Sequence, residues 1–219
     1  MTVIYAIPVA SVNPDDPTVR SLISPDRLEL LDRRAGPGRA QSVAATLLLE
    51  YAIARRFPFV PHPLAISVAE GGKPHLVAQP GVHFSLSHAG AWAVCAVSDQ
   101  PVGVDIERRE PGRRDIAERF FHKEETRYLN SLVPYRREDA FYSLWVLKEA
   151  FVKATGHGLS LPLRSFCVNL RADPPTLSCE EVDRPYSLAL VPFPADLAYR
   201  LAVCTEGADA EEPLLEILN

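Results

Sequence analysis

The sequence lacks an excess of basic residues. It has 23 lysines and arginines against 28 aspartates and glutamates, which gives a formal net charge of -5. Proteins that bind nucleic acids in general usually carry a positive balance, because they must neutralise the phosphate backbone. The charge therefore argues against a general nucleic-acid binder, although a local basic pocket is compatible with it.

Long apolar runs are missing as well. No stretch reaches the roughly 18 apolar residues that identify a membrane-spanning helix. The start, MTVIYAIPVASVNPDD, has no basic segment of the kind that opens a signal peptide. We therefore expect a cytoplasmic protein without a membrane partner.

Cysteines are few, and none forms a C-x-x-C pair or lies at metal-site spacing from a histidine. We expect reduced, mostly buried thiols at all four positions, Cys95, Cys167, Cys179 and Cys204. The 20 prolines are scattered along the chain, so the composition indicates no flexible linker.

The apolar residues that are present predict two similar halves. They recur with helical spacing over 40–57 and again over 136–155, and they alternate in a hairpin that turns at Gly90. Further strands are predicted in both halves. Because each half offers a helix and a hairpin, we predict an α+β fold with an N-terminal subdomain over 1–101 and a C-terminal subdomain over 102–219.

The segment VGVDIE contains two acids on a predicted strand. Asp105 and Glu107 are two residues apart, so both side chains point to the same face. Two carboxylates on one face repel each other unless water or a cation lies between them. A divalent cation is one explanation, since the neighbouring Val104 and Ile106 suit a core. The alternative is that the strand ends here and both acids are solvated.

The segment FYSLWVLKEAFVKATGHGL reads as a mostly apolar helix, yet it contains three charged residues: Lys148, Glu149 and Lys153. Glu149 and Lys153 lie one turn apart, and such a pair is often only a surface ion pair. Among apolar neighbours, however, a charged group needs a partner away from bulk water. If Glu149 faces Asp105 and Glu107, three carboxylates can hold Mg²⁺ while Lys153 meets a phosphate.

Two upstream motifs suit anion binding. In GGKPH, Lys73 stands between Gly72 and Pro74 in a tight loop that a phosphate or an aromatic ring can approach, unless it is an ordinary surface turn. In FSLSHAG, Ser87 and His88 precede a hairpin turn. No G-x-S-x-G surrounds them, so we interpret them as anion-binding groups and not as a nucleophile and its base.

These motifs together carry a resemblance to a known family. GGKPH, FSLSHAG, VGVDIE, RFFHKEE and WVLKEAFVKATGHGLSLPL occur in this order, and the chain thereby resembles the Sfp-type 4′-phosphopantetheinyl transferases. The resemblance implies two α+β subdomains related by a pseudo-twofold axis, with coenzyme A in the cleft between them. It also implies transfer of the 4′-phosphopantetheine arm to a serine of an apo acyl or peptidyl carrier protein, with release of adenosine 3′,5′-bisphosphate.

The resemblance also implies roles for individual residues. Asp105, Glu107 and Glu149 would hold Mg²⁺, or Mn²⁺ in its place. Glu149 would deprotonate the carrier serine, directly or through water, and Lys153 would assist the leaving phosphate. Lys148 stays open between a contact to pantetheine and an exposed ammonium group. Contacts to coenzyme A are implied for a further group: Arg27, Gly72, Lys73, Pro74, Ser87, His88 and Lys153.

The N-terminal part departs from the family pattern. Arg27 fits a basic position that holds the 3′-phosphate of coenzyme A, but Leu30 and Ser42 stand where a further basic residue is expected. A nearby arginine would have to compensate. The candidates are Arg33, Arg34 and Arg39.

The segment 108–121 corresponds to the part of the family that meets the carrier protein. It is rich in arginine although the chain is acidic, which suits an acidic carrier helix. The alternative is an ordinary solvated helix with its phenylalanines in the core. The two-subdomain length is typical of the monomeric members of the family. The docking residues expected from this segment are Arg113, Ile116, Phe120 and Phe121.

Two other functions compete with this interpretation. A D-x-E motif with a nearby glutamate and lysine can also build the site of a magnesium-dependent nuclease, but the acidic balance and the lack of Lys/Arg runs argue against it. A non-catalytic carrier-binding module would not need the site. All four of its charged residues are nevertheless present: Asp105, Glu107, Glu149 and Lys153.

Overall fold

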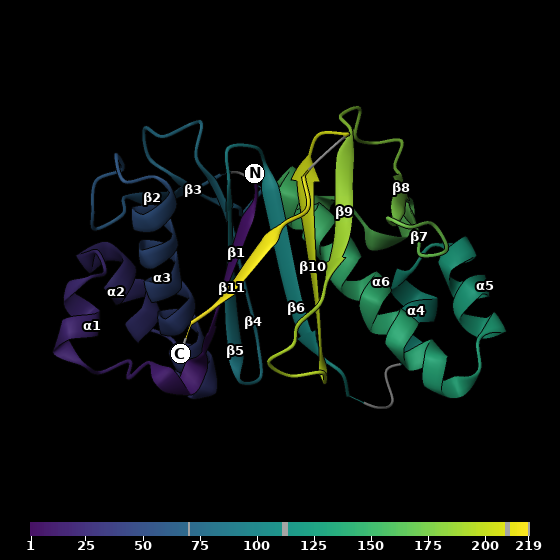
Figure 1. Ribbon diagram of the computed structural model, residues 1–219, viewed down its shortest axis with the longest axis horizontal. Helices are drawn as coiled ribbons and strands as arrows, with labels where there is room; N and C mark the ends of the chain where they lie inside the picture. Colours follow the sequence, from purple (N-terminus) through teal and green to yellow (C-terminus); the bar gives the residue numbers. More distant parts are fainter. Residues whose placement is uncertain (70, 111–113, 209–210, 219) are drawn as a thin grey trace.

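Two sheets lie face to face in the middle of the molecule, and each is covered by one long helix (Figure 1). This computed structural model describes residues 1–69, 71–110, 114–208 and 211–218. The first sheet has the strand order β11-β1-β5-β4 and the second β6-β10-β9. Their strands are β1 (Val3–Pro8), β4 (His83–Ala89), β5 (Trp92–Ser98), β6 (Val102–Arg108), β9 (Tyr186–Val191), β10 (Tyr199–Glu206) and β11 (Leu214–Ile217). Two small hairpins pair β2 (Ile66–Val68) with β3 (Pro74–Leu76), and β7 (Cys167–Asn169) with β8 (Thr176–Ser178).

The two long helices are α3 (Pro37–Arg56), on the first sheet, and α6 (Pro134–Thr155), on the second. Each begins with a proline in its first turn, where the missing N–H breaks no helical hydrogen bond. α6 ends at Gly156, which takes the left-handed conformation at φ 75°. The remaining helices are α1 (Pro17–Ser21), α2 (Pro25–Asp32), α4 (Arg114–Phe120) and α5 (Lys123–Ser131), with the 3-10 turns η1 (Val9–Ser11), η2 (Gly158–Ser160) and η3 (Leu163–Ser165).

The α+β class predicted from the sequence is confirmed. The expected helices correspond to α3 and α6, and the expected hairpin is β4 and β5 with Gly90 at its turn. The division of the chain after residue 101 stays a prediction. The structure shows one strand pairing that the sequence did not indicate. The strand β11, near the end of the chain, pairs in parallel with β1 of the first half, and Leu214 lies opposite Val3.

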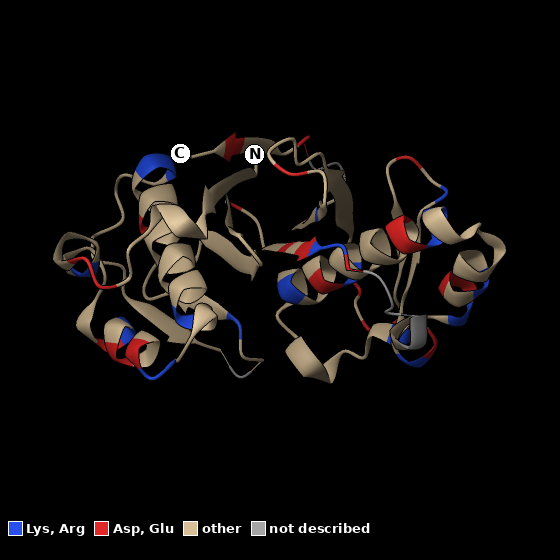
Figure 2. Cartoon of the chain, turned by 90° about the horizontal axis from the view of Figure 1, so that it is seen from below, with Lys and Arg blue, Asp and Glu red and all other residues tan. Residues whose placement is uncertain are grey.

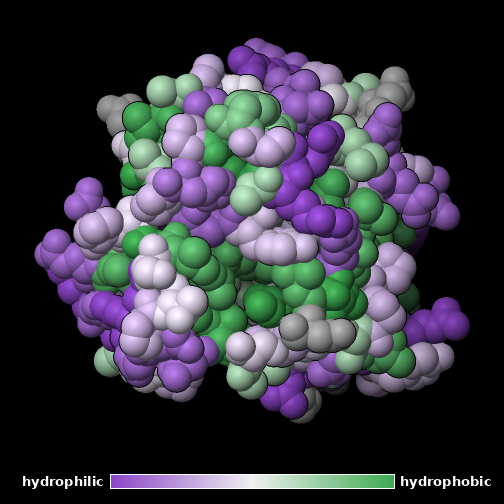
Figure 3. All heavy atoms as spheres, turned by 60° about the vertical axis from the view of Figure 1, so that its left-hand side comes forward, coloured by the Kyte–Doolittle hydropathy of each residue, from purple (hydrophilic) through white to green (hydrophobic). Residues whose placement is uncertain are grey.

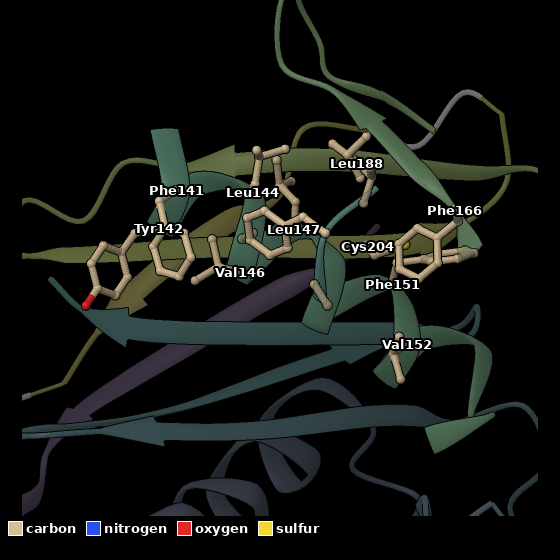
Figure 4. Close-up of a cluster of buried hydrophobic side chains, with 14 of the residues drawn as sticks. Phe141, Tyr142, Leu144, Val146, Leu147, Phe151, Val152, Phe166, Leu188 and Cys204 are labelled. Atoms are coloured by element: carbon tan, nitrogen blue, oxygen red, sulfur yellow. The ribbon is translucent and has the colours of Figure 1, made fainter. Parts of the chain in front are cut away.

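α6 contributes most of the core of the second half (Figure 4). Leu147 and Phe151 are fully buried, and the ring of Phe151 meets that of Phe166 edge to face with centroids 4.8 Å apart. A second apolar layer fills the space between the two sheets, and a third lies beneath α3. The helix α6, which carries Lys148, Glu149 and Lys153, is held against β6, β9 and β10 by a close-packed core.

Gly103 sets the distance between β6 and α6. A Cβ atom at this position would lie 1.9 Å from the carbonyl oxygen of Ala150 and 2.4 Å from the backbone nitrogen of Ala154. Only glycine permits this close approach. The acids of VGVDIE are thereby brought beside the charged residues of α6, as the charge-coloured view shows (Figure 2).

The surface mixes apolar and polar side chains. On the face shown in Figure 3, apolar side chains gather around a hollow that hydrophilic ones surround. Apolar surface of this kind is common in folded proteins and identifies no partner by itself. Within the described ranges, no helix has the length and apolar character to cross a bilayer. All four cysteines are free thiols, as expected.

Candidate active site

Asp105 is the buried centre of the site. It lies in the middle of β6 and is 5% exposed. Its Oδ1 accepts hydrogen bonds from Ser87 Oγ at 2.8 Å and from Lys153 Nζ at 2.7 Å. Its Oδ2 is buried too but accepts no hydrogen bond from the residues that the structure describes. A buried carboxylate oxygen without a donor is costly, so the site is suited to a ligand from outside the chain.

Lys153 joins three elements around this carboxylate. From α6 its Nζ reaches Asp105 on β6, and it also donates to the carbonyl oxygens of Val104 at 3.1 Å and of Leu86, on β4, at 3.4 Å. Its side chain is 30% exposed. Because the ion pair of Lys153 is with Asp105 and not with Glu149, the simple surface pair considered for these two residues of the helix is wrong.

Glu149 is the second carboxylate at this point, half-buried on α6. Burial raises the pKa of Glu149, the negative charge of Asp105 raises it further, and Lys153 lowers it. Two carboxylates that repel each other, one with a donor-free oxygen, form an oxygen-rich site that a divalent cation would stabilise. The residues present therefore fit Mg²⁺.

Glu107 follows Asp105 by two residues on β6 and is also half-buried. Among the described side chains, no group of three or more histidines, cysteines, aspartates or glutamates is arranged so that it could hold a metal ion. The structure thus brings Asp105 and Glu149 together, and the participation of Glu107 as a third ligand stays a prediction.

A cleft of about 740 Å³ opens beside these residues and is lined from both halves of the molecule. The first half contributes the loop GGKPH and residues 84–86 of β4, and α6 contributes the charged pair of the site, Glu149 and Lys153. Apolar side chains and two arginines complete the wall: Phe120, Trp145, Leu159, Leu161, Leu163, Arg119 and Arg164. The sequence had pointed to few of these, because residues from η2 and η3 meet α4 only in the folded chain.

The loop GGKPH packs tightly against the end of α6. A Cβ atom on Gly71 would lie 1.9 Å from the carbonyl oxygen of Gly156. Lys73 Nζ donates to the carbonyl oxygens of Val102 and Ala154, both at 3.0 Å. Burial lowers the pKa of Lys73 to about 8. This ammonium group therefore fastens the loop onto β6 and α6, and its contact to coenzyme A stays a prediction.

Arg27, Arg34 and His88 form a second group of basic side chains. Burial lowers the pKa of Arg27, and the charge of Arg34 lowers it further. Burial also lowers the pKa of His88, followed by the charges of Lys153 and Arg34. Arg34 donates to Ser42 Oγ at 3.1 Å. Repulsion between the two guanidinium groups would be relieved by an anion, which the His88 ring could also contact, so this group suits a phosphate.

The other two candidate arginines are engaged elsewhere. Arg33 forms an ion pair with Glu29, at 2.5 Å. Arg39 forms ion pairs with Asp15 at 2.8 Å and with Asp32 at 3.0 Å. Of the three arginines considered as compensation for Leu30 and Ser42, Arg34 is therefore the one that lies with Arg27 and His88.

Lys148 has a role that neither sequence-based alternative included. It is fully buried, and its Nζ donates to Glu125 at 2.6 Å and to the carbonyl oxygen of Phe166 at 2.8 Å. Glu125 also caps α5 by accepting from the His122 N–H at 2.8 Å. Lys148 is therefore neither exposed nor at the cleft. The signal that was overlooked is the second glutamate of RFFHKEE.

The expected docking residues are distributed differently from the prediction. Phe121 is only 4% exposed and stacks on Phe141, so it belongs to the core and is not available to a partner. Phe120 is 40% exposed and lines the cleft, whereas Ile116 is half-buried against the core. Arg113 lies outside the described residues.

An α+β fold with a carboxylate and lysine centre at the wall of a cleft defines a candidate transferase site, and comparisons with known proteins identify the class. The model of the 4′-phosphopantetheinyl transferase superfamily matches residues 101–204. A 4′-phosphopantetheinyl transferase of Bacillus subtilis is 41% identical over 169 residues, which cover 77% of this chain and 75% of that protein. The 4′-phosphopantetheinyl transferase Sfp of Bacillus subtilis (strain 168) is 36% identical over 195 residues, 89% of this chain and 87% of that protein.

The similarities to the two Bacillus proteins extend over most of the chain. The chain belongs to the 4′-phosphopantetheinyl transferase superfamily, so the resemblance inferred from the sequence is confirmed. Among solved structures, the holo-[acyl-carrier-protein] synthase of Thermotoga maritima aligns with 48% of this chain and 62% of its own, at a TM-score of 0.41 and 23% identity.

Proposed function

We propose that this protein transfers the 4′-phosphopantetheine arm of coenzyme A to a serine of an apo acyl or peptidyl carrier protein. The serine oxygen would form a new bond to the phosphorus next to pantetheine, while the bond from that phosphorus to the bridging pyrophosphate oxygen breaks. The products are the holo carrier and adenosine 3′,5′-bisphosphate. The observation that carries this proposal is the buried Asp105 carboxylate, whose Oδ1 meets Lys153 and whose Oδ2 accepts no hydrogen bond from the described residues, in a chain of this superfamily.

Asp105 and Glu149 would hold Mg²⁺, with Glu107 as a further ligand. Oxygen ligands of this kind suit Mg²⁺, which keeps part of its coordination for phosphate oxygens. When bound, the cation neutralises charge on the pyrophosphate as the leaving group departs. The donor-free oxygen of Asp105 and the repulsion between the two carboxylates support this assignment.

Glu149 would take the proton of the attacking serine, directly or through one water molecule. Its raised pKa favours this role, because a carboxylate with a higher pKa is a stronger base and accepts the serine proton more favourably. Lys153 would stabilise the negative charge that develops on the leaving phosphate, since its side chain reaches the cleft with 30% of its surface exposed.

Coenzyme A would lie across the two halves. The basic group of Arg27, Arg34 and His88 suits its 3′-phosphate. The loop with Gly72, Lys73 and Pro74 would contact the adenosine, by its backbone because the Lys73 ammonium is engaged. Ser87 is implied in the same binding by the resemblance.

The carrier protein would dock beside the cleft. Phe120 offers exposed apolar surface there, and Arg119 and Arg164 offer positive charge for an acidic helix. Leu159 stands fully exposed at the same cleft and would add an apolar contact. We also propose that the protein acts in the cytoplasm and as a monomer.

The experiment is incubation of the protein with coenzyme A, Mg²⁺ and a panel of apo-carrier proteins, followed by mass spectrometry of each carrier. We expect the mass of one phosphopantetheine arm to be added, and we expect excess chelator to prevent it. Absence of any modified carrier across the panel would overturn the proposal. Cleavage of a nucleic acid under the same conditions would instead support the rival nuclease.

A further inference from the structure

The strands β4 and β6 meet at the junction of the two halves in an unusual way. They lie side by side but belong to different sheets, and no backbone ladder pairs them within the strands that the structure describes. Serine side chains of β4 take over instead. Ser85 Oγ accepts from the Val104 N–H at 3.0 Å, and Ser87 Oγ accepts from the Ile106 N–H at 3.4 Å. Because residues two apart on a strand share a face, both serines of FSLSHAG face β6.

Ser87 makes one contact that Ser85 does not. A hydroxyl group accepts hydrogen bonds but has a single hydrogen to donate. Ser87 donates this hydrogen to Asp105 Oδ1 at 2.8 Å, the oxygen that Lys153 Nζ also contacts at 2.7 Å. Ser87 is 8% exposed and Asp105 5%, so water does not readily replace either partner. Two donors thus fix one oxygen of the carboxylate, and no described residue donates to the other, Oδ2.

We propose that Ser87 is a positioning residue which orients the Asp105 carboxylate so that Oδ2 is presented to the divalent cation. The proposal rests on the proposed function and deepens it. Without the hydroxyl, Oδ1 keeps only the Lys153 contact, and the carboxylate gains freedom to rotate. Hydrogen-bond partners of metal ligands commonly change metal affinity by about 10- to 100-fold when they are removed.

This role differs from the contact to coenzyme A that the family resemblance implies for Ser87. Its single hydrogen is used by Asp105, so the hydroxyl has none left for a phosphate oxygen. The two roles predict different binding defects. Loss of a positioning residue weakens the metal and spares coenzyme A in the absence of metal, whereas loss of a direct contact weakens coenzyme A itself.

The chain offers a matched control. Ser85→Ala removes the same kind of bond, from a serine hydroxyl to a backbone N–H of β6, two residues earlier on β4. Ser85 contacts no carboxylate in its described hydrogen bonds. Both serines are nearly buried, at 5% and 8% exposure, so the two substitutions disturb the junction to a similar extent.

The experiment measures the Kd of Mn²⁺ by electron paramagnetic resonance, with the protein saturated with coenzyme A and no carrier present. We expect Ser87→Ala to weaken Mn²⁺ binding about tenfold, while Ser87→Thr, which keeps the hydroxyl, and Ser85→Ala stay within about threefold of wild type. Calorimetry with chelator present measures coenzyme A alone, and there Ser87→Ala should bind as wild type does.

Several results would overturn the positioning role. They are wild-type Mn²⁺ affinity in Ser87→Ala, an equal loss in Ser85→Ala, weakened coenzyme A binding in chelator, or no Mn²⁺ binding by the wild type. If Ser87→Ala does not fold, Ser87→Cys takes its place, because a thiol keeps a similar size and is a weak donor. Failure of the wild type to modify any carrier counts against the proposed function alone, since the Mn²⁺ measurement needs no carrier.

Discussion

Two lysines of α6 meet carboxylates in two different settings. Lys148 and Glu125 form an ion pair at 2.6 Å, with both side chains 0% exposed. Lys153 and Asp105 form one at 2.7 Å, in which the lysine is 30% exposed at the cleft. In the Lys148–Glu125 pair, which we call the closed pair, Glu125 Oε1 also accepts from the Val168 N–H at 2.7 Å, and the other carboxylate oxygen of Glu125 caps α5. In the Lys153–Asp105 pair, which we call the open pair, no residue that the structure describes donates to Asp105 Oδ2.

The difference teaches how to separate a structural ion pair from a chemical one. Every charged oxygen of the closed pair is satisfied by the chain, so it needs nothing from outside and serves to hold α5, α6 and β7 together. The open pair leaves one buried oxygen unsatisfied, and its lysine lines a cleft, which is where an active site keeps capacity for a substrate or a metal. Distance alone does not distinguish the two.

The largest effect should come from removing the open carboxylate. For Asp105→Ala we expect transfer to fall by at least about 1,000-fold, which corresponds to roughly 4 kcal/mol in activation free energy. The free energy of unfolding should change by about 1 kcal/mol or less, because the variant also relieves a buried, unsatisfied oxygen. Carrier modification rates and urea denaturation measure the two. Turnover within tenfold of wild type would show that this carboxylate takes no part in the reaction.

The closed pair should give the opposite result. Lys148→Met leaves the charge of Glu125 buried without its cation, and we expect the free energy of unfolding to fall by about 3 kcal/mol. The rate per folded molecule should stay within about threefold of wild type, since neither residue lines the cleft. Urea denaturation measures the stability, and the rate of carrier modification divided by the concentration of folded protein measures the activity.

A double variant tests whether the loss in Lys148→Met comes from the unpaired charge. Adding Glu125→Gln to Lys148→Met removes that charge, and we expect it to recover part of the stability. A double variant that is less stable by the sum of the two single losses would indicate that the pair carries no coupling and that packing alone explains the effect.

A smaller, mixed effect is expected where β6 approaches α6. Gly103→Ala places a Cβ atom 1.9 Å from the Ala150 carbonyl oxygen, so the strand or the helix must shift. We expect a loss of about 2 kcal/mol in unfolding free energy, and a rate about tenfold lower because Asp105 and Glu149 move apart. Gly38→Ala is the control, since no atom lies within 4 Å of its Cβ position. Equal behaviour of the two variants would contradict the close-packing argument.

The smallest effect concerns Lys73, a third lysine, which contacts backbone carbonyls in place of a carboxylate. Its folded-state pKa is lowered to about 8 by burial, below that of the unfolded chain. Between these two pKa values the unfolded chain binds more protons, so the contribution of Lys73 to stability rises with pH above about 8 and is lost as the pH falls through that value.

This pH dependence is measured against a variant that cannot titrate. We expect the free energy of unfolding of wild type, relative to that of Lys73→Met, to be higher at pH 9.5 than at pH 7. Urea denaturation at the two pH values measures this difference. A difference that is independent of pH would mean that the ammonium group is better solvated than its two carbonyl contacts indicate.

Much of the site was predictable, but not which contact each group makes. The spacing of Asp105 and Glu107 and the apolar setting of Glu149 and Lys153 indicated a polar centre between β6 and α6. The partner of Lys153 was not predictable, because helix spacing favours Glu149 while the fold supplies Asp105 from a strand 48 residues away. For the same reason, the exposure of two adjacent phenylalanines could not be assigned before α4 and α6 were placed.

The sequence by itself determined the α+β class, the two long helices, the family and the acids and lysines of the site. These depend on local periodicity and on motif order, which are properties of the linear chain. Only the tertiary structure decided that Lys148 is closed inside the core, that Ser87 donates to Asp105 and that Arg34 joins Arg27. Each of these is a contact between residues distant in sequence or on different elements, and burial and packing choose such partners among many candidates of equal chemistry.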